Sequence, residues 1–305
     1  MSLDRLIDAV RRTNNPTVAG LDPTLAYIPE HIKAAAFAAH GETLEGAAAA
    51  LLAFNKGLID ALCDIVPAVK PQAAYYELYG WPGVRTLADT IAYAQSRGMF
   101  LITDGKRNDI GATMEAYAAA HLGTTAVGGN RFSAFGADAL TVTGYLGTDG
   151  IAPLLTVCRE RDAGIFVLAK TSNPSSGELQ DLEVDGVPIY RRMGDLCETW
   201  GTELPGKSSY SGVGAVVGAT YPAQLAELRK ALPRTYFLVP GYGAQGGGAA
   251  DVAGGFDENG EGAIINASRS ILCAWQRENC PGEDFAGAAR REALRMREDL
   301  NRVRG

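Results

Sequence analysis

Cysteine and histidine are scarce in this 305-residue chain, with five and three copies. The cysteines are odd in number and form no C-x-x-C pair, which argues against a disulfide framework and a structural zinc site. No apolar run approaches the about 20 residues of a membrane span, and residues 1–13 are too charged for a secretory signal. A net charge of −7 is unlike a nucleic-acid scaffold. We therefore expect a soluble cytoplasmic protein that binds neither membrane nor nucleic acid.

Short apolar runs recur along the chain, each followed by a glycine-rich or polar turn and then by a helical pattern. The runs are mostly continuous, which is typical of strands buried on both faces of a parallel sheet. Repeated strand–helix alternation at this length predicts an α/β fold, a single (β/α)8 TIM barrel over residues 1–305. The expected strands are residues 17–21, 68–70, 99–103, 139–142, 165–169, 213–219, 236–239 and 263–266.

Three connections exceed the usual about 2–6 residues of a strand–helix loop. They follow strands 1, 5 and 7 and cover residues 23–46, 175–212 and 246–262. The second contains a helical pattern of its own, whereas the third is rich in Gly and Asp and indicates a mobile surface loop. We interpret all three as insertions into the barrel.

Two phosphate-loop patterns occur in the chain. Residues 201–208 match G-x-x-x-x-G-K-[ST], but a helix precedes and a strand follows, the inverse of the context that loop needs. Residues 241–246 match G-x-G-x-x-G after a strand, but the glycine-rich continuation is a poor helix for a dinucleotide fold. The first is interpreted as a connecting loop. For the second, we expect only that its backbone N–H groups can bind an anion.

Charged side chains gather at the predicted ends of the first three strands. Asp104 and Lys106 end one strand, and their spacing of two places both on the same side of an extended chain. Asp109 follows after a short turn, while Lys70 and Asp22 end two other strands. Barrel active sites lie at this end of the strands. These residues form either a catalytic cluster or a structural network of ion pairs.

The later strand ends have the composition of an anion site. The turn at residues 240–247 is rich in glycine, whose backbone N–H groups can approach an anion, and Gln245 adds a donor. Arg269, directly after Ser268, suits a phosphate. Alternatively, the glycines only make a tight turn and the arginine is a surface charge. Ser172 and Asn173 follow the fifth strand and could bind a polar heterocycle or cap the following helix. Metal-ligand spacing is absent, so we expect no metal and no cofactor.

Six segments together resemble the orotidine 5′-phosphate decarboxylase family, in its longer, monofunctional bacterial subgroup. They occur in the family's order and span most of the chain. The Asp-x-Lys-x-x-Asp element is shared with related sugar-phosphate enzymes, whereas the glycine loop and the late Arg-Ser make the match more specific. The segments are 19–23 (AGLDP), 69–72 (VKPQ), 104–110 (DGKRNDI), 170–174 (KTSNP), 240–247 (PGYGAQGG) and 266–271 (NASRSI).

The resemblance implies a carbon–carbon lyase that converts orotidine 5′-phosphate to uridine 5′-phosphate in de novo pyrimidine synthesis without a cofactor. Lys106 would donate a proton to C6 of the pyrimidine, and Asp104 would face the substrate carboxylate. Lys70 would bridge the aspartates and the ribose, Asp22 would bind a ribose hydroxyl, and Ser172 would contact the pyrimidine edge.

The remaining implied roles concern the phosphate and a second subunit. Gln245 and Arg269 would bind the phosphate with help from the backbone near Ser268. Asp109, with Thr113, would reach the neighbouring site in a homodimer. Three rivals remain open: a metal-assisted sugar-phosphate enzyme, a non-catalytic phosphometabolite-binding protein, and an aldolase that forms a Schiff base on its strand-2 lysine.

Overall fold

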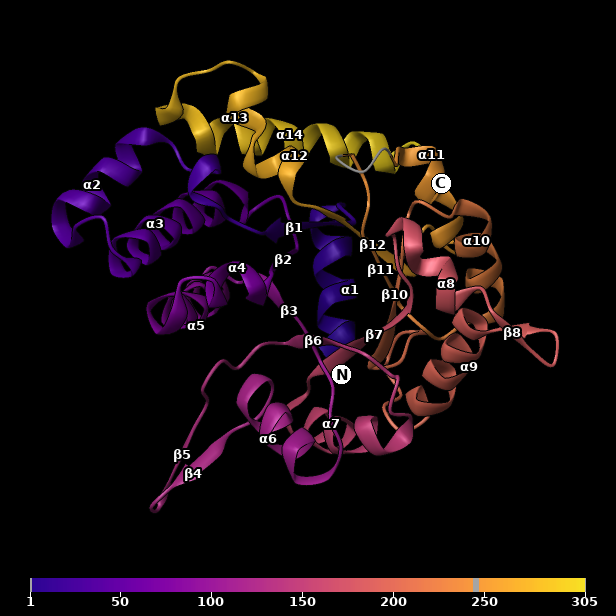
Figure 1. Ribbon diagram of the computed structural model, residues 1–305. Helices are drawn as coiled ribbons and strands as arrows, with labels where there is room; N and C mark the ends of the chain where they lie inside the picture. Colours follow the sequence, from indigo (N-terminus) through magenta and orange to yellow (C-terminus); the bar gives the residue numbers. More distant parts are fainter. Residues whose placement is uncertain (1, 244–246, 305) are drawn as a thin grey trace.

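The computed structural model describes residues 2–243 and 247–304. Eight parallel strands close into a barrel with helices around it, which confirms the predicted (β/α)8 fold (Figure 1). Their order around the barrel is β1-β12-β11-β10-β7-β6-β3-β2. The barrel strands are β1 (Thr17–Leu21), β2 (Ala68–Pro71), β3 (Phe100–Arg107), β6 (Ala139–Val142), β7 (Gly164–Lys170), β10 (Val213–Val217), β11 (Phe237–Val239) and β12 (Ala263–Ala267).

Alternate residues of these strands face two different apolar layers. Phe100 and Ile102 of β3 point into the barrel, where Phe166 also lies. Leu101, between them, and Val167 belong to the outer layer under the helices. Every residue of β1, β10 and β12 is buried, as the continuous apolar runs indicate.

Helix α1 (Ser2–Thr13) lies across the middle of the ring in Figure 1. Its apolar stripe, Leu3, Leu6, Ile7 and Val10, packs into the interior layer with residues from the starts of the strands. The charged residues between them exclude a secretory signal, but they leave this helical spacing of apolar residues intact. The helix thus closes the end of the barrel opposite the strand carboxyl ends.

The loop at residues 201–208 does hold an anion, but the anion is a side chain of α1. The backbone N–H groups of Lys207 and Ser208 each donate to the Asp4 carboxylate at 2.9 Å. Burial on its own would raise the pKa of Asp4, but these hydrogen bonds outweigh it and lower the pKa to about 2. The interpretation of this segment as a structural connection agrees with these contacts.

The expected insertions are more regular than the sequence suggests. Residues 23–46 contain η1 (Leu25–Tyr27) and α2 (Glu30–His40). The boundary of the second insertion is wrong, because α9 (Ile189–Gly201) packs on β7 and β10 as the barrel's own fifth helix. The added part is η2 (Pro174–Ser176), α8 (Gly177–Gln180) and the hairpin of β8 (Glu183–Val184) and β9 (Val187–Pro188).

The third expected insertion is not an open loop throughout. Within it, α11 (Ala249–Val252) and η3 (Ala253–Gly255) pack against α10 (Pro222–Ala231), and Val252 is fully buried. A further hairpin, β4 (Thr125–Val127) with β5 (Asn130–Phe132), was not predicted; it projects from the body of the molecule (Figure 1).

The remaining helices complete the ring. Among the residues described, no helix combines the length and apolarity that crossing a membrane requires. The helices that complete the ring are α3 (Leu44–Leu62), α4 (Ala73–Glu77), α5 (Gly80–Ser96), α6 (Gly111–His121), α7 (Thr148–Arg161), α12 (Arg269–Leu272), α13 (Ala274–Arg277), α14 (Phe285–Asn301) and the short η4 (Gly282–Asp284).

Candidate active site

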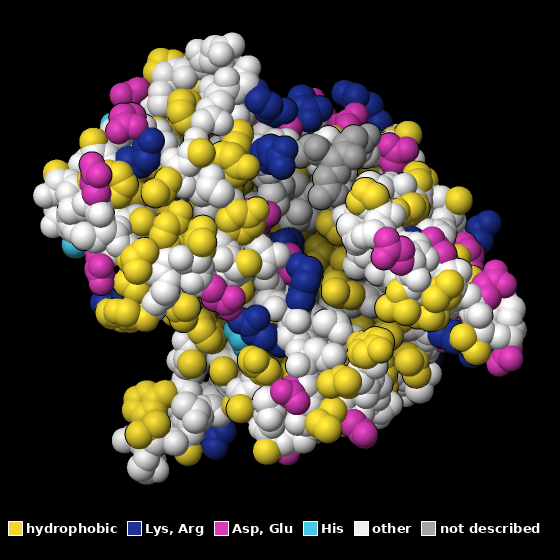
Figure 2. Space-filling view, in the orientation of Figure 1, with side chains coloured by type: hydrophobic (Ala, Val, Ile, Leu, Met, Phe, Trp, Pro, Cys, Tyr) yellow, Lys and Arg dark blue, Asp and Glu magenta, His cyan; other side chains and the backbone are white. Residues whose placement is uncertain are grey.

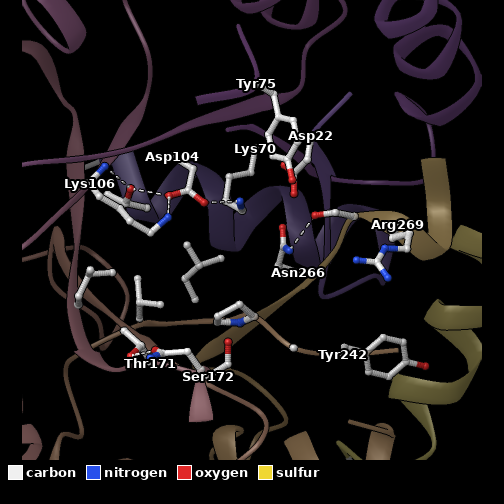
Figure 3. A pocket seen from close by; sticks show the side chains of 18 of the residues that line it. Asp22, Lys70, Tyr75, Asp104, Lys106, Thr171, Ser172, Tyr242, Asn266 and Arg269 are labelled. Atoms are coloured by element: carbon white, nitrogen blue, oxygen red, sulfur yellow. Dashed lines mark hydrogen bonds and ion pairs between the residues drawn. The ribbon is translucent and has the colours of Figure 1, made fainter. Parts of the chain in front are cut away.

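A cavity of about 540 Å³ opens at the carboxyl ends of the barrel strands. Its volume lies in the range of small-molecule sites. Figure 2 shows the hollow in this face with cationic side chains beside it. In Figure 3, Lys106, Asp104 and Lys70 lie in a row, Arg269 lies at the far end, and Ser172 lies on the facing side. The first three strand ends and the later ones therefore meet at one cavity, as the sequence predicts.

Asp104 is the centre of the charged cluster. One carboxylate oxygen, Oδ2, accepts from Lys70 Nζ at 2.5 Å. The other, Oδ1, accepts from Lys106 Nζ at 2.6 Å and from Thr141 Oγ1 at 2.8 Å. Burial on its own would raise the pKa of Asp104, but the two ammonium groups outweigh it and hold that pKa far below its usual range.

The two lysines differ in exposure. The side chain of Lys70 is 5% exposed and that of Lys106 is 45% exposed. Burial alone would lower the pKa of Lys70, but the charges of Asp104 and Asp22 prevail and raise it. Lys70 is therefore a fixed buried cation, whereas the Lys106 ammonium group is open to a ligand in the cavity.

The local backbone of β3 is not the regular strand that the sequence argument assumed. Its register against β6 shifts between Thr103 and Arg107, and Lys106 has a φ of +46°. The backbone N–H of Lys106 donates to Thr141 Oγ1 at 3.0 Å, and this threonine also donates to Asp104. The Lys106 ammonium group therefore contacts Asp104 from a bulged part of the strand, and not through the regular alternation that a spacing of two residues predicts.

Two cavity side chains carry unpaired oxygens. Oδ1 of Asp22 and Oδ1 of Asn266 are buried and have no hydrogen-bond partner within residues 2–243 and 247–304. A buried polar atom of this kind is costly unless a ligand or water satisfies it. Asp22 was predicted. Asn266 was not singled out, because one amide at a strand end carries little signal without its neighbours. Tyr75 and Tyr242, which also line the cavity, were missed for the same reason.

The opposite wall carries the predicted anion-binding residues. Arg269 begins α12, lines the cavity and has no ion-pair partner in the described part of the chain. Ser268 also lines the cavity and accepts from Asn266 Nδ2 at 3.2 Å. Gln245 lies outside the described residues. The free guanidinium of Arg269 therefore faces the same space as the Asp104 cluster.

Thr171, Ser172 and Asn173 line a third side of the cavity. Asn173 precedes η2, but its side chain makes no capping hydrogen bond among the described residues. It accepts instead from Thr171 Oγ1 at 2.6 Å. The capping alternative is therefore not supported at this position.

Asp109 and Thr113 lie apart from these residues. Neither is among the described residues that line the cavity. Asp109 Oδ1 accepts from the backbone N–H of Ile110 at 2.8 Å, and Thr113 is exposed on α6. Within one chain, therefore, the predicted Asp-x-Lys-x-x-Asp element is divided between the cavity and the surface.

Residues 35–279 match the model of the orotidine 5′-phosphate decarboxylase / HUMPS family. A protein of Rhodopirellula baltica named orotidine 5′-phosphate decarboxylase is 46% identical over 296 residues, covering 96% of each chain. The chain belongs to the orotidine 5′-phosphate decarboxylase / HUMPS family. The family assignment and its enzyme class, a decarboxylase, are thus confirmed.

Two further comparisons agree with membership in the orotidine 5′-phosphate decarboxylase / HUMPS family. An orotidine 5′-phosphate decarboxylase of Caldicellulosiruptor bescii is 37% identical over 298 residues, covering 98% of this chain and 97% of that one. The structure of Leishmania donovani OMP decarboxylase aligns with a TM-score of 0.77 at 30% identity, over 99% of this chain and 98% of that chain. The family likeness therefore extends well beyond the motifs.

Proposed function

We propose that this protein decarboxylates orotidine 5′-phosphate to uridine 5′-phosphate in pyrimidine synthesis. Family membership supports the reaction. The observation that carries the proposal is Asp104, which contacts the ammonium groups of Lys70 and Lys106 in the cavity that Arg269 also lines. We also propose that residues 1–305 form one domain, because α1 and α14 both pack on the same barrel.

In the proposed mechanism, Lys106 is the proton donor. The bond between C6 and the carboxylate breaks, carbon dioxide leaves, and the electron pair stays on C6. The ammonium group of Lys106 stabilises this developing charge and transfers a proton to C6, and the neutral amine then takes a proton from water. Asp104 lies against the substrate carboxylate, and repulsion between the two anions is relieved as carbon dioxide leaves.

The remaining roles concern substrate binding. Arg269, with Gln245 and the backbone at Ser268, binds the phosphate, and this binding energy holds the reacting carbon beside Lys106. Asp22 accepts a hydrogen bond from a ribose hydroxyl, which would satisfy its unpaired oxygen. Ser172 contacts the edge of the pyrimidine. Lys70 holds Asp104 and reaches toward the ribose.

We further propose that the enzyme is a homodimer in which Asp109 and Thr113 complete the partner's site. An exposed apolar surface supports this arrangement. Its members lie on the segments that follow β2, β3 and β6, which are neighbours in the barrel, and exposed apolar side chains at one side of a protein are typical of protein–protein contacts. Its exposed side chains are Leu78, Trp81, Ile110, Tyr145 and Leu146.

One rival function is disfavoured by the geometry. A Schiff-base aldolase needs a neutral amine at Lys70, but this lysine is buried, its ammonium group lies 2.5 Å from Asp104, and its pKa is raised. A protonated lysine is a poor nucleophile. The geometry thus gives Lys70 an electrostatic role.

The proposed reaction is tested by mixing the purified protein with orotidine 5′-phosphate in excess EDTA and following the ultraviolet spectrum. We expect conversion to uridine 5′-phosphate at the same rate as without EDTA. Loss of activity in EDTA supports a metal-assisted enzyme. Binding of uridine 5′-phosphate without any consumption of orotidine 5′-phosphate supports a binding protein instead.

A further inference from the structure

Lys170 is a buried lysine that the proposed mechanism does not use. It is the last residue of β7 and its side chain is fully buried. Leu168, two residues earlier, lines the cavity. The register between β7 and β10 then shifts, so that Leu168 pairs with Val216 but Lys170 pairs with Val217. This bulge breaks the alternation that would otherwise place Lys170 in the cavity beside Leu168.

The Lys170 ammonium group lies among groups of the surrounding helices and loops. It donates to Asp181 Oδ1 at 2.7 Å and lies 4.3 Å from the centre of the Tyr221 ring. Asp181 Oδ1 also accepts from Gln224 Nε2 at 3.0 Å. The ion pair thus joins the end of β7 to the residue that follows α8.

Lys170 and Asp181 stand on either side of a loop, residues 171–180. A second link closes the same loop just inside the ion pair. The backbone N–H of Thr171 donates to Gln180 Oε1 at 2.9 Å, and Gln180 Nε2 donates to Thr171 Oγ1 at 2.8 Å. The base of the loop is therefore held by one ion pair and one reciprocal pair of hydrogen bonds.

The cavity-facing part of the loop comes directly after this closure. Thr220 Oγ1 donates to the backbone oxygen of Ser172 at 3.0 Å, and the Tyr221 hydroxyl donates to that of Asn173 at 3.2 Å. Tyr221 is the same residue whose ring lies under the Lys170 ammonium group. Lys170 is thus linked to the loop at both ends. Its ion pair reaches Asp181, after the end of the loop, and its contact with Tyr221 leads to Asn173, the residue after Ser172.

We propose that Lys170 and Asp181 are positioning residues that hold the 171–180 loop so that Ser172 meets the pyrimidine. This inference rests on the proposed function, which places the pyrimidine beside this loop. Neither residue touches the substrate. Their contribution is to restrict the loop before the ligand arrives, so that less ordering is needed on binding.

An apolar side chain could fill the space that the charged Lys170 side chain occupies. A well-packed apolar side chain of similar volume often replaces a buried ion pair without loss of stability. Lys170→Met, combined with Asp181→Asn, therefore removes the ion pair while leaving no unpaired buried charge. Gln180→Leu provides a second variant that opens the base of the loop without touching the ion pair. Lys33→Met, which removes an ion pair with Glu30 on α2, is the matched control.

The experiment measures the dissociation constants of uridine 5′-phosphate and ribose 5-phosphate by calorimetry for each variant. Ribose 5-phosphate has no base and cannot contact Ser172. We expect the constant for uridine 5′-phosphate to rise about tenfold in the double variant and in Gln180→Leu. The constant for ribose 5-phosphate stays unchanged in both, and Lys33→Met changes neither.

Equal weakening of both ligands would show general damage to the barrel and would overturn the positioning role. Unchanged binding of uridine 5′-phosphate in the double variant would also overturn it. Failure of the proposed function has a different signature, since the unmodified protein would then leave orotidine 5′-phosphate unconsumed.

Discussion

Asp104 imposes different conditions on its two lysine partners. Both of its oxygens are engaged, and the carboxylate stays ionised because two ammonium groups face it. Lys70 is enclosed, so it supplies a constant charge, whereas Lys106 keeps nearly half of its side chain exposed. At the residue scale, the account therefore gives Lys70 an electrostatic role and Lys106 the transfer of the proton.

Arg269 provides a prediction at the same scale. Because its guanidinium has no other ion-pair partner among the described residues, Arg269→Ala removes a contact to the substrate phosphate and little else. We expect a loss of about 2–4 kcal/mol in transition-state stabilisation, which lowers kcat/KM by the corresponding factor. Steady-state kinetics measure this, with Arg85→Ala on α5 as the control. An unchanged kcat/KM would remove Arg269 from the phosphate site.

At the scale of elements, Gly20 shows how closely β1 approaches the phosphate side of the cavity. A Cβ at this position would overlap the Ser268 hydroxyl and lie 3.0 Å from Asn266 Oδ1. We expect Gly20→Ala to displace the segment after β12 and to lower kcat/KM about tenfold. Gly129→Ala, where a Cβ meets nothing within 4 Å, is the control. Equal kinetics in the two variants would contradict the close approach.

The same scale shows what the sequence could predict. The strand ends carry the chemistry, so the apolar runs and the charged residues after them were enough to bring Asp22, Lys70 and Asp104 to one cavity. Bulges cannot be predicted from the same pattern, because a continuous apolar run does not show where the register between two strands shifts. The outward turn of Lys170 and its pairing with Asp181 were therefore beyond sequence reasoning. The stripe in α1, by contrast, was readable and was overlooked.

At the scale of the whole molecule, the homodimer proposal makes a complementation prediction. Lys106→Ala and Asp109→Ala are each expected to be inactive alone. If Asp109 acts in the partner's site, a mixed dimer carries one intact site, and random exchange of subunits restores about one quarter of the activity. The activity of the mixture after co-refolding measures this. No recovery would mean that both residues serve the same chain's site.

The pH dependence of stability follows from His121. Burial, with the charge of Arg107, lowers the pKa of this imidazole from 6.5 to about 4, and the ring stacks on Phe135 at 4.8 Å. The unfolded chain takes up a proton below about pH 6.5, while the folded chain resists protonation until about pH 4. The free energy of unfolding should therefore fall as the pH falls through this window, by about 2 kcal/mol between pH 6.5 and pH 5.

Urea unfolding near pH 7 and near pH 5 checks this prediction. His121→Phe should reduce the difference in unfolding free energy between the two conditions, and His40→Phe, at an exposed position on α2, should leave it unchanged. If the difference in unfolding free energy persists in His121→Phe, other titrating groups cause it.

The most direct test of the central claim is the turnover of orotidine 5′-phosphate by Lys106→Ala, followed by ultraviolet absorbance alongside uridine 5′-phosphate binding. We predict that turnover is abolished while binding largely persists, because Arg269 and the loop at Ser172 remain in place. Near-normal turnover in this variant would contradict the assignment of Lys106 as the proton donor.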